Sequence, residues 1–174
     1  MSIFLSYSRG DAQQADDWVA NLEKFGYRVW IDRAGIRGGQ QWNATIVRSI
    51  KEAQALILLL SPNSARSDNV RREIDLAVEA KKPIIPIEIQ VTTMPENLQY
   101  QLAGVQLLQV WRSPRGGLPL VLAALKQAGV ERGDARVVEA TPGRPGSGEA
   151  NVDLAELGNL GFLSKIAFWR RKSV

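Results

Sequence analysis

The sequence contains no cysteine and no histidine. The absence of cysteine excludes a disulfide framework, a thiol nucleophile and a cysteine-ligated metal site. Without histidine, the chain also lacks the most frequent general base and the commonest transition-metal ligand. Any catalysis must therefore rest on carboxylates, hydroxyl groups, lysine, arginine, tyrosine and the backbone.

Long apolar segments are missing as well. No run of 18 or more apolar residues occurs, so the sequence predicts no transmembrane helix. The first six residues have neither the basic region nor the sustained apolar region of a signal peptide. We therefore expect a cytoplasmic protein.

The excess of positive charge is small and local. The chain has 22 basic and 18 acidic residues. Four of the basic residues lie among the last ten positions, and without them the two signs balance at 18 each. A nucleic-acid partner is therefore not expected. The length of 174 residues is typical of one domain with a tail.

Short apolar runs alternate with segments of helical spacing. The run over 55–60 is apolar throughout, as in a strand that a parallel sheet buries on both faces. The alternation predicts an α/β, flavodoxin-like three-layer fold: a five-stranded parallel sheet of order 2-1-3-4-5 with helices on both faces. Strands are predicted at 3–6, 27–31, 55–60, 83–89 and 105–110, helices at 11–25, 42–53, 70–81 and 118–128, and loops at 32–41 and 61–69.

The composition changes after Ala128. Residues 129–151 include five glycines and two prolines without periodicity, which predicts a flexible linker after a domain that covers 1–128. Apolar residues return at near-helical spacing in 152–169, followed by Arg170, Arg171 and Lys172, so we expect an amphipathic tail helix with a basic end over 152–174. This helix can dock onto a domain or lie on a membrane surface. Alternatively, the chain ends inside a longer effector protein.

Three polar segments follow the first three predicted strands, at 6–11, 32–42 and 61–69. In a doubly wound sheet, ligands bind beyond the carboxyl ends of the strands. A functional site is therefore expected there. A receiver domain shares this strand order, but its phosphoacceptor aspartate would end the third strand, where this chain has Ser61.

These segments resemble the signature boxes of the TIR domain family, in particular its bacterial, NAD-cleaving members. The resemblance covers about residues 1–128, in the family's order and spacing. It rests on 4–8 with Asp11, on 30–32 with Gly38, Gly39 and Trp42, on 59–64 with Ser67 and Glu73, and on 83–87.

The resemblance implies an NAD⁺ nucleosidase that releases nicotinamide and ADP-ribose or a cyclic isomer. In such enzymes one glutamate follows a serine of the third box by six residues, as Glu73 follows Ser67. A carboxylate can anchor the ribose hydroxyls and stabilise the positive charge that develops on the sugar. Because nicotinamide leaves as a neutral group, strong acid catalysis is unnecessary. NAD⁺ is then the substrate, and no cofactor is expected.

The same resemblance places further residues around the ligand. Arg9 offers a guanidinium fork for phosphate, Trp42 an aromatic face for a ring, and Gly39 lies in a glycine-containing loop able to move. The alternatives are a solvated Arg9 and core packing for Trp42, with core packing favoured for Trp30. The complete expected set is catalytic Glu73 with Tyr7, Ser8, Arg9, Asp32, Gly39, Trp42 and Ser67.

Two carboxylates have structural alternatives. Asp32 can cap its loop through an Asx turn. Glu73 lies near the start of a predicted helix, where the dipole favours a carboxylate and Arg72 or a lysine can pair with it.

One departure from the family pattern concerns the third box. Many active relatives place an aromatic residue, usually tryptophan, between the serine and the glutamate, whereas this chain has Asn69. A non-enzymatic adaptor acting through TIR–TIR contacts is therefore a rival, as is an enzyme acting on other nucleosides or cyclic nucleotides. The resemblance further implies self-association through the loop after the second strand. It suits a bacterial defence effector or a virulence factor.

Overall fold

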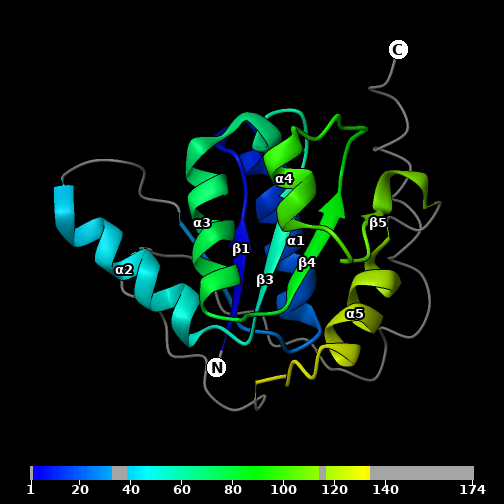
Figure 1. Cartoon of the computed structure of the whole chain (residues 1–174). Coiled ribbons are helices and arrows are strands. Elements are labelled where there is room, and N and C mark those ends of the chain that lie inside the picture. Colours follow the sequence, from blue (N-terminus) through cyan, green and yellow to red (C-terminus); the bar gives the residue numbers. More distant parts are fainter. Residues whose placement is uncertain (1, 33–38, 114–116, 134–174) are drawn as a thin grey trace, which may run out of the picture. The chain divides into compact units, whose positions relative to one another are not determined.

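A computed structural model of the chain describes residues 2–32, 39–113 and 117–133, without the side chains of 39–43. Five parallel strands form its sheet in the order β2-β1-β3-β4-β5 (Figure 1). The predicted flavodoxin-like order is confirmed. The strands are β1 Ile3–Ser6, β2 Val29–Ile31, β3 Ala55–Leu60, β4 Ile84–Glu88 and β5 Leu108–Gln109.

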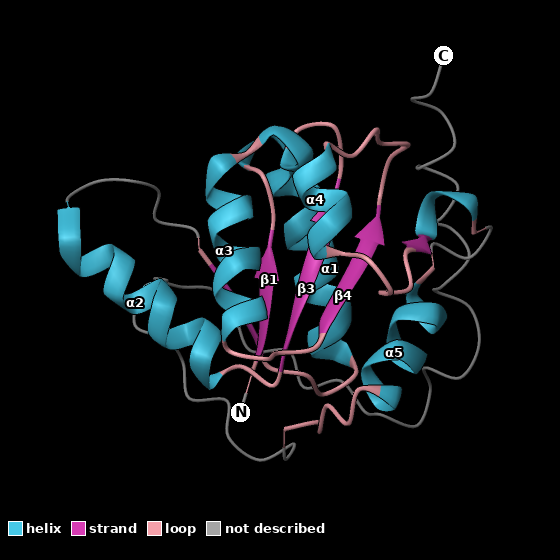
Figure 2. Ribbon diagram, viewed as in Figure 1, coloured by secondary structure: helices cyan, strands magenta, loops and turns pink. Residues whose placement is uncertain are grey.

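Helices cover both faces of the sheet, as Figure 2 shows. The helices α1 and α5 pack on one face, and α2, α3 and α4 pack on the other. The described residues also form three short 3₁₀ helices. The bounds are η1 Arg9–Asp11, α1 Ala12–Lys24, α2 Gly39–Glu52, η2 Ser64–Arg66, α3 Asp68–Glu79, α4 Glu96–Gln101, η3 Val110–Arg112 and α5 Leu118–Gln127.

The centre of the sheet is the centre of the hydrophobic core. All six residues of β3 are buried, as its uninterrupted apolar run predicts. Because successive side chains of a strand point to opposite faces, Ile57 and Leu59 pack with α1 and α5, whereas Leu56, Leu58 and Leu60 pack with the helices on the other side. Two apolar layers therefore enclose one sheet.

Element boundaries differ from the prediction in places. The short helix α4 is not predicted by the sequence, because six residues after Pro95 are too few to display a helical period. The strand β5 covers only Leu108–Gln109 of the predicted 105–110, since the chain turns into η3 at Val110. The helix α2 begins at Gly39, inside the predicted loop 32–41.

The compact part of the chain continues past Ala128, where the predicted domain ends. Val130 is buried in the core beside α1 and α5, and the Gly133 amide donates a hydrogen bond to the Gly26 carbonyl at 2.8 Å. The remainder of the predicted linker and the tail helix 152–174 lie outside the described residues, so the domain boundaries stay a prediction. No helix in the described ranges has the length and apolarity needed to cross a membrane.

Candidate functional site

A cavity of about 150 Å³ lies where the segments after β1 and β2 meet the start of α3. An engineered protein cavity of this size accommodates benzene, so this one has room for a single ring-sized group. Six of the eight predicted site residues lie together around it. Its lining consists of Leu5, Tyr7, Ser8, Arg9, Asp32, Ser67, Asn69 and Glu73.

The other two predicted residues lie in the first turn of α2. Gly39 is the first residue of this helix, and Trp42 follows three positions later. The Trp42 side chain is outside the described part of the structure, so its contact with a ligand stays a prediction. Trp30 packs against the core, with its ring stacked on Phe4 at a centroid distance of 4.9 Å. The core interpretation of Trp30 is confirmed.

Glu73 is a buried carboxyl group in the wall of the cavity. Its side chain lies on the sheet-facing stripe of α3, together with Val70, Ile74 and Ala77. The Ser6 hydroxyl, at the end of β1, donates a hydrogen bond to Oε2 of Glu73 at 2.6 Å. Among the described residues Glu73 forms no ion pair, so the structure does not support the interpretation of this residue as a surface ion pair.

Burial controls the ionisation of Glu73. The pKa of this carboxyl is raised from 4.5 to about 7: removal from water is the largest cause, the Ser6 hydrogen bond acts in the opposite direction, and the negative charge of Asp32 adds to the rise. Desolvation has the largest effect on this pKa because the carboxylate exchanges its hydrating water molecules for a single hydrogen-bond donor, Ser6. A group that titrates near neutral pH can both take up and release a proton under ordinary conditions.

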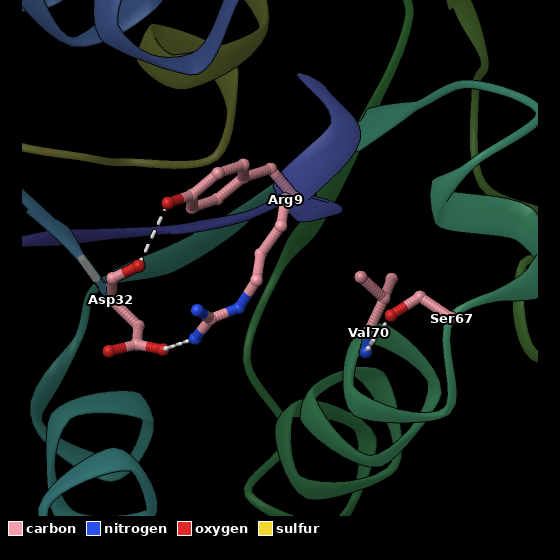
Figure 3. Close-up of polar contacts among 5 residues, drawn as sticks. Arg9, Asp32, Ser67 and Val70 are labelled. Atoms are coloured by element: carbon pink, nitrogen blue, oxygen red, sulfur yellow. Dashed lines mark hydrogen bonds and ion pairs between the residues drawn. The ribbon is translucent and has the colours of Figure 1, made fainter. Parts of the chain in front are cut away.

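Arg9 and Asp32 form an ion pair at the rim of the cavity (Figure 3), with 3.6 Å between Nη2 and Oδ2. Tyr7 also contacts Asp32, because its hydroxyl donates a hydrogen bond to the main-chain carbonyl oxygen of Asp32 at 2.9 Å. The side chain of Arg9 is 59% exposed and that of Asp32 is 16% exposed. Because the Arg9 side chain is mostly exposed, its guanidinium is accessible to an anionic ligand at the rim.

Ser67 has a structural role at the beginning of α3. Its hydroxyl oxygen accepts a hydrogen bond from the Val70 amide at 3.4 Å, which caps the helix (Figure 3). Ser67 also lines the cavity, and so does Asn69. The wall beside Glu73 is therefore polar.

A buried polar network supports the segment that carries Arg9. Asp11 accepts hydrogen bonds from the Ser61 hydroxyl and from the Asn63 side-chain amide, at 2.5 and 2.8 Å. The Ser61 oxygen in turn accepts from the Asn63 and Ser64 amides, both at 3.1 Å. Sequence reasoning placed these residues in neighbouring polar segments but did not identify their pairing.

Glu88 is a further buried carboxylate that the sequence does not predict. It accepts hydrogen bonds from the Thr92 amide at 3.1 Å, from Gln109 at 2.8 Å and from the Trp111 indole at 2.7 Å. Three donors, one on β5 and two in the segments after β4 and β5, satisfy this group, and it does not line the cavity. Its one sequence signal is an acid that ends an otherwise apolar strand. We assign it a structural role.

The cavity therefore combines a buried carboxyl, a second carboxylate and a guanidinium at its rim. Carboxylates bind hydroxyl groups and stabilise positive charge, and a guanidinium fork binds phosphate. This chemistry suits a sugar–phosphate ligand with a cationic centre. Within the described residues, no three acidic side chains come close enough together to hold a metal ion.

Comparison with known proteins agrees with this fold. A family model described as TIR domain matches residues 3–117. No curated protein is significantly similar to the chain. Among solved structures, the TIR domain of the Toll-related receptor TRR-2 from Hydra magnipapillata is 17% identical, with a TM-score of 0.59 over 72% of this chain and 94% of that one. The TIR domains of the activated Roq1 resistosome, which recognises the pathogen effector XopQ, are 16% identical, with a TM-score of 0.45 over 79% of this chain and 89% of that one.

Proposed function

The chain belongs to the TIR domain family, and on that premise we propose that it is an NAD⁺ nucleosidase that releases nicotinamide and ADP-ribose or a cyclic ADP-ribose isomer. NAD⁺ is the substrate, and the reaction needs no further cofactor. The observation that carries this proposal is the placement of Glu73. Its buried carboxyl lines a ring-sized cavity whose rim carries Arg9 and Asp32.

In the proposed reaction, the bond between the ribose C1′ and the nicotinamide nitrogen breaks. The electron pair of this bond stays on the nitrogen, so nicotinamide leaves neutral and the sugar becomes a cation. The Glu73 carboxylate stabilises this cation. Water then adds at C1′ and loses its proton, which yields ADP-ribose, or a nitrogen of the adenine ring adds instead and yields the cyclic isomer.

The size and charge of the site support a particular orientation of the substrate. A cavity of about 150 Å³ has room for one ring of the nicotinamide riboside end of NAD⁺ and not for the whole dinucleotide. The ribose hydroxyls then lie beside Glu73 and Asp32, and the phosphates extend toward Arg9 at the exposed rim. The adenosine half remains outside this cavity, where a second copy of the domain can cover it. We therefore propose that self-association activates the enzyme.

The experiment that tests the function follows nicotinamide release from NAD⁺. The wild type is compared with Glu73→Gln, first in dilute solution and then with a crowding agent. The matched control is Glu79→Gln, an exposed residue at the end of the same helix. We expect release by the wild type and the control, enhanced by crowding, and a loss of at least a hundredfold in Glu73→Gln. Absence of release by the concentrated wild type would overturn the proposal.

A second candidate function is a non-enzymatic adaptor. The observation in its favour is Asn69, which lines the cavity in place of an aromatic ring. The substitution Asn69→Trp separates the two functions. An enzyme gains affinity for NAD⁺ from the added stacking surface, whereas an adaptor shows no turnover with either residue at any concentration.

A further inference from the structure

We propose that Ser6 is the positioning residue of Glu73: its buried hydroxyl binds Oε2 of the carboxyl and leaves Oε1 as the oxygen that meets the substrate. This inference rests on the proposed function, because it assigns a task to the same carboxyl. Ser6 does not line the cavity and was not among the residues predicted to contact a ligand.

The direction of the Ser6 side chain follows from the geometry of β1. Phe4 and Ser6 are two positions apart and therefore point to the same face of the sheet, the face that α2, α3 and α4 cover. Glu73 lies on the stripe of α3 that packs against this face. Figure 1 shows α3 beside β1, in agreement with the hydrogen bond that joins the two residues.

The hydroxyl group is unexpected at this position. Ser6 is completely buried, in a strand whose other three residues are apolar. A buried hydroxyl without a partner costs free energy, and an apolar side chain would fill the same position without that cost. The hydrogen bond to Glu73 offsets the cost of burying the hydroxyl, so the contact with this carboxyl explains why a serine occupies the position.

The hydrogen bond from Ser6 makes the two oxygens of the Glu73 carboxyl unequal. Oε2 is occupied by Ser6, whereas no group in the described part of the chain donates a hydrogen bond to Oε1. A carboxyl held at one oxygen loses the freedom to rotate about its last bond. Its free oxygen is then fixed in the wall of the cavity before the substrate arrives, which is the preorganisation that electrostatic catalysis requires.

Ser6 cannot itself be the nucleophile. A serine 2.6 Å from a carboxylate has the spacing of a nucleophile and its base. However, its side chain has no exposed surface and lies outside the cavity lining, so an approaching sugar carbon meets Glu73 first. The hydroxyl therefore acts through the carboxyl.

The test compares Ser6→Ala with Ser6→Thr, which keeps the hydroxyl, and with Ser64→Ala as the matched control. Ser64 is another buried serine, whose side chain bonds to Ser61. The first measurement is a carbon NMR titration of the Glu73 carboxyl, and the second is the dependence of kcat/KM for NAD⁺ on pH. If Ser6→Ala does not fold, Ser6→Cys retains the volume and weakens the donor.

The groups that influence the Glu73 carboxyl are Ser6 on β1 and Asp32 at the end of β2, and Arg9 is the charged group that lines the same cavity with Asp32. The hydrogen bond from Ser6 stabilises the ionised form of Glu73, and the substitution Ser6→Ala removes it. We expect the titration midpoint in Ser6→Ala to rise by about one pH unit, and kcat/KM at pH 6 to fall about tenfold. Ser6→Thr restores both values, and Ser64→Ala changes neither.

The positioning role would be overturned by an unchanged Glu73 midpoint in Ser6→Ala, or by an equal change in Ser64→Ala. The titration needs no turnover, so the failures of the two proposals can be told apart. A wild type that does not release nicotinamide overturns the nucleosidase function. A Ser6→Ala variant with wild-type kcat/KM at every pH overturns the role of Ser6 alone.

Discussion

Asp11 accepts a hydrogen bond from the hydroxyl of Ser61 at 2.5 Å. Both side chains are buried, and they come from segments that follow different strands, β1 and β3. Asp11 ends the short helix η1 that begins at Arg9. The bond therefore connects the segment that carries the rim arginine to the centre of the sheet.

Replacement of Asp11 by alanine leaves the Ser61 hydroxyl without its acceptor in a buried place. We expect the free energy of unfolding to decrease by about 2 kcal/mol, the cost of an unsatisfied buried polar group. Urea denaturation measures the change. The control is Asp17→Ala, an exposed residue of α1, for which a change within about 0.5 kcal/mol is expected. Equal effects of the two substitutions would contradict a special role for the buried pair.

The stability of the wild type depends on pH through Glu73. Its pKa is about 7 in the folded chain against an ordinary value of 4.5. Between these values the folded chain keeps a proton that the unfolded chain releases, so the free energy of unfolding falls as the pH rises. Below pH 4.5 Glu73 is protonated in both the folded and the unfolded chain. Above pH 7 the folded chain bears the full cost of burying the ionised carboxylate, on the order of 3 kcal/mol.

Glu73→Gln removes this penalty, because glutamine carries no charge at any pH. We expect the variant to be more stable than the wild type at pH 8 and of similar stability at pH 4, with the difference growing through the window between them. Urea midpoints at several pH values measure this difference. The exposed Glu79→Gln serves as the control. A constant difference across the whole range would show that Glu73 does not titrate as described.

Catalysis by an ionised Glu73 requires the opposite pH dependence. The fraction of carboxylate rises about tenfold for each pH unit below the pKa and levels off above it. We therefore expect kcat/KM for NAD⁺ to increase with pH up to about 7 and then become constant. Asp32→Asn removes a negative charge that raises this pKa, so the inflection should move to lower pH. Movement to higher pH would contradict the coupling of the two carboxyl groups.

Arg9 is expected to recognise the phosphates of the substrate. Arg9→Ala should raise KM for NAD⁺ about tenfold, which corresponds to one charge-assisted hydrogen bond, with little change in kcat. Nicotinamide riboside has no phosphate, so its turnover should be unaffected. Arg72→Ala, an exposed arginine of α3 that does not line the cavity, is the control. An equal loss of activity with NAD⁺ and with nicotinamide riboside would show that Arg9 does not act by recognising the phosphates.

The sequence by itself determined the order of strands and helices and the edge of the sheet where the site lies. The apolar run Ala55–Leu60 is a local pattern that reflects a strand buried on both faces. The helical spacing of 70–81 is a local pattern that reflects a helix buried on one face. Parallel strands bring their carboxyl ends to one edge, so the polar segments that follow them had to meet. For this reason the positions of Arg9 and Asp32 along the chain suffice to group their segments at one edge, whereas the expectation for Glu73 comes from the resemblance to the TIR domain family.

Only the tertiary structure decided which polar groups pair and how they ionise. Ser6 and Glu73 are 67 residues apart, and Asp11 and Ser61 are 50 apart, so no local pattern connects them. The direction of each side chain depends on how α3 and η1 pack against the sheet. The pKa of Glu73 depends on the water that this packing removes. Local periodicity is set by neighbours along the chain, whereas desolvation and hydrogen bonding are set by neighbours in space.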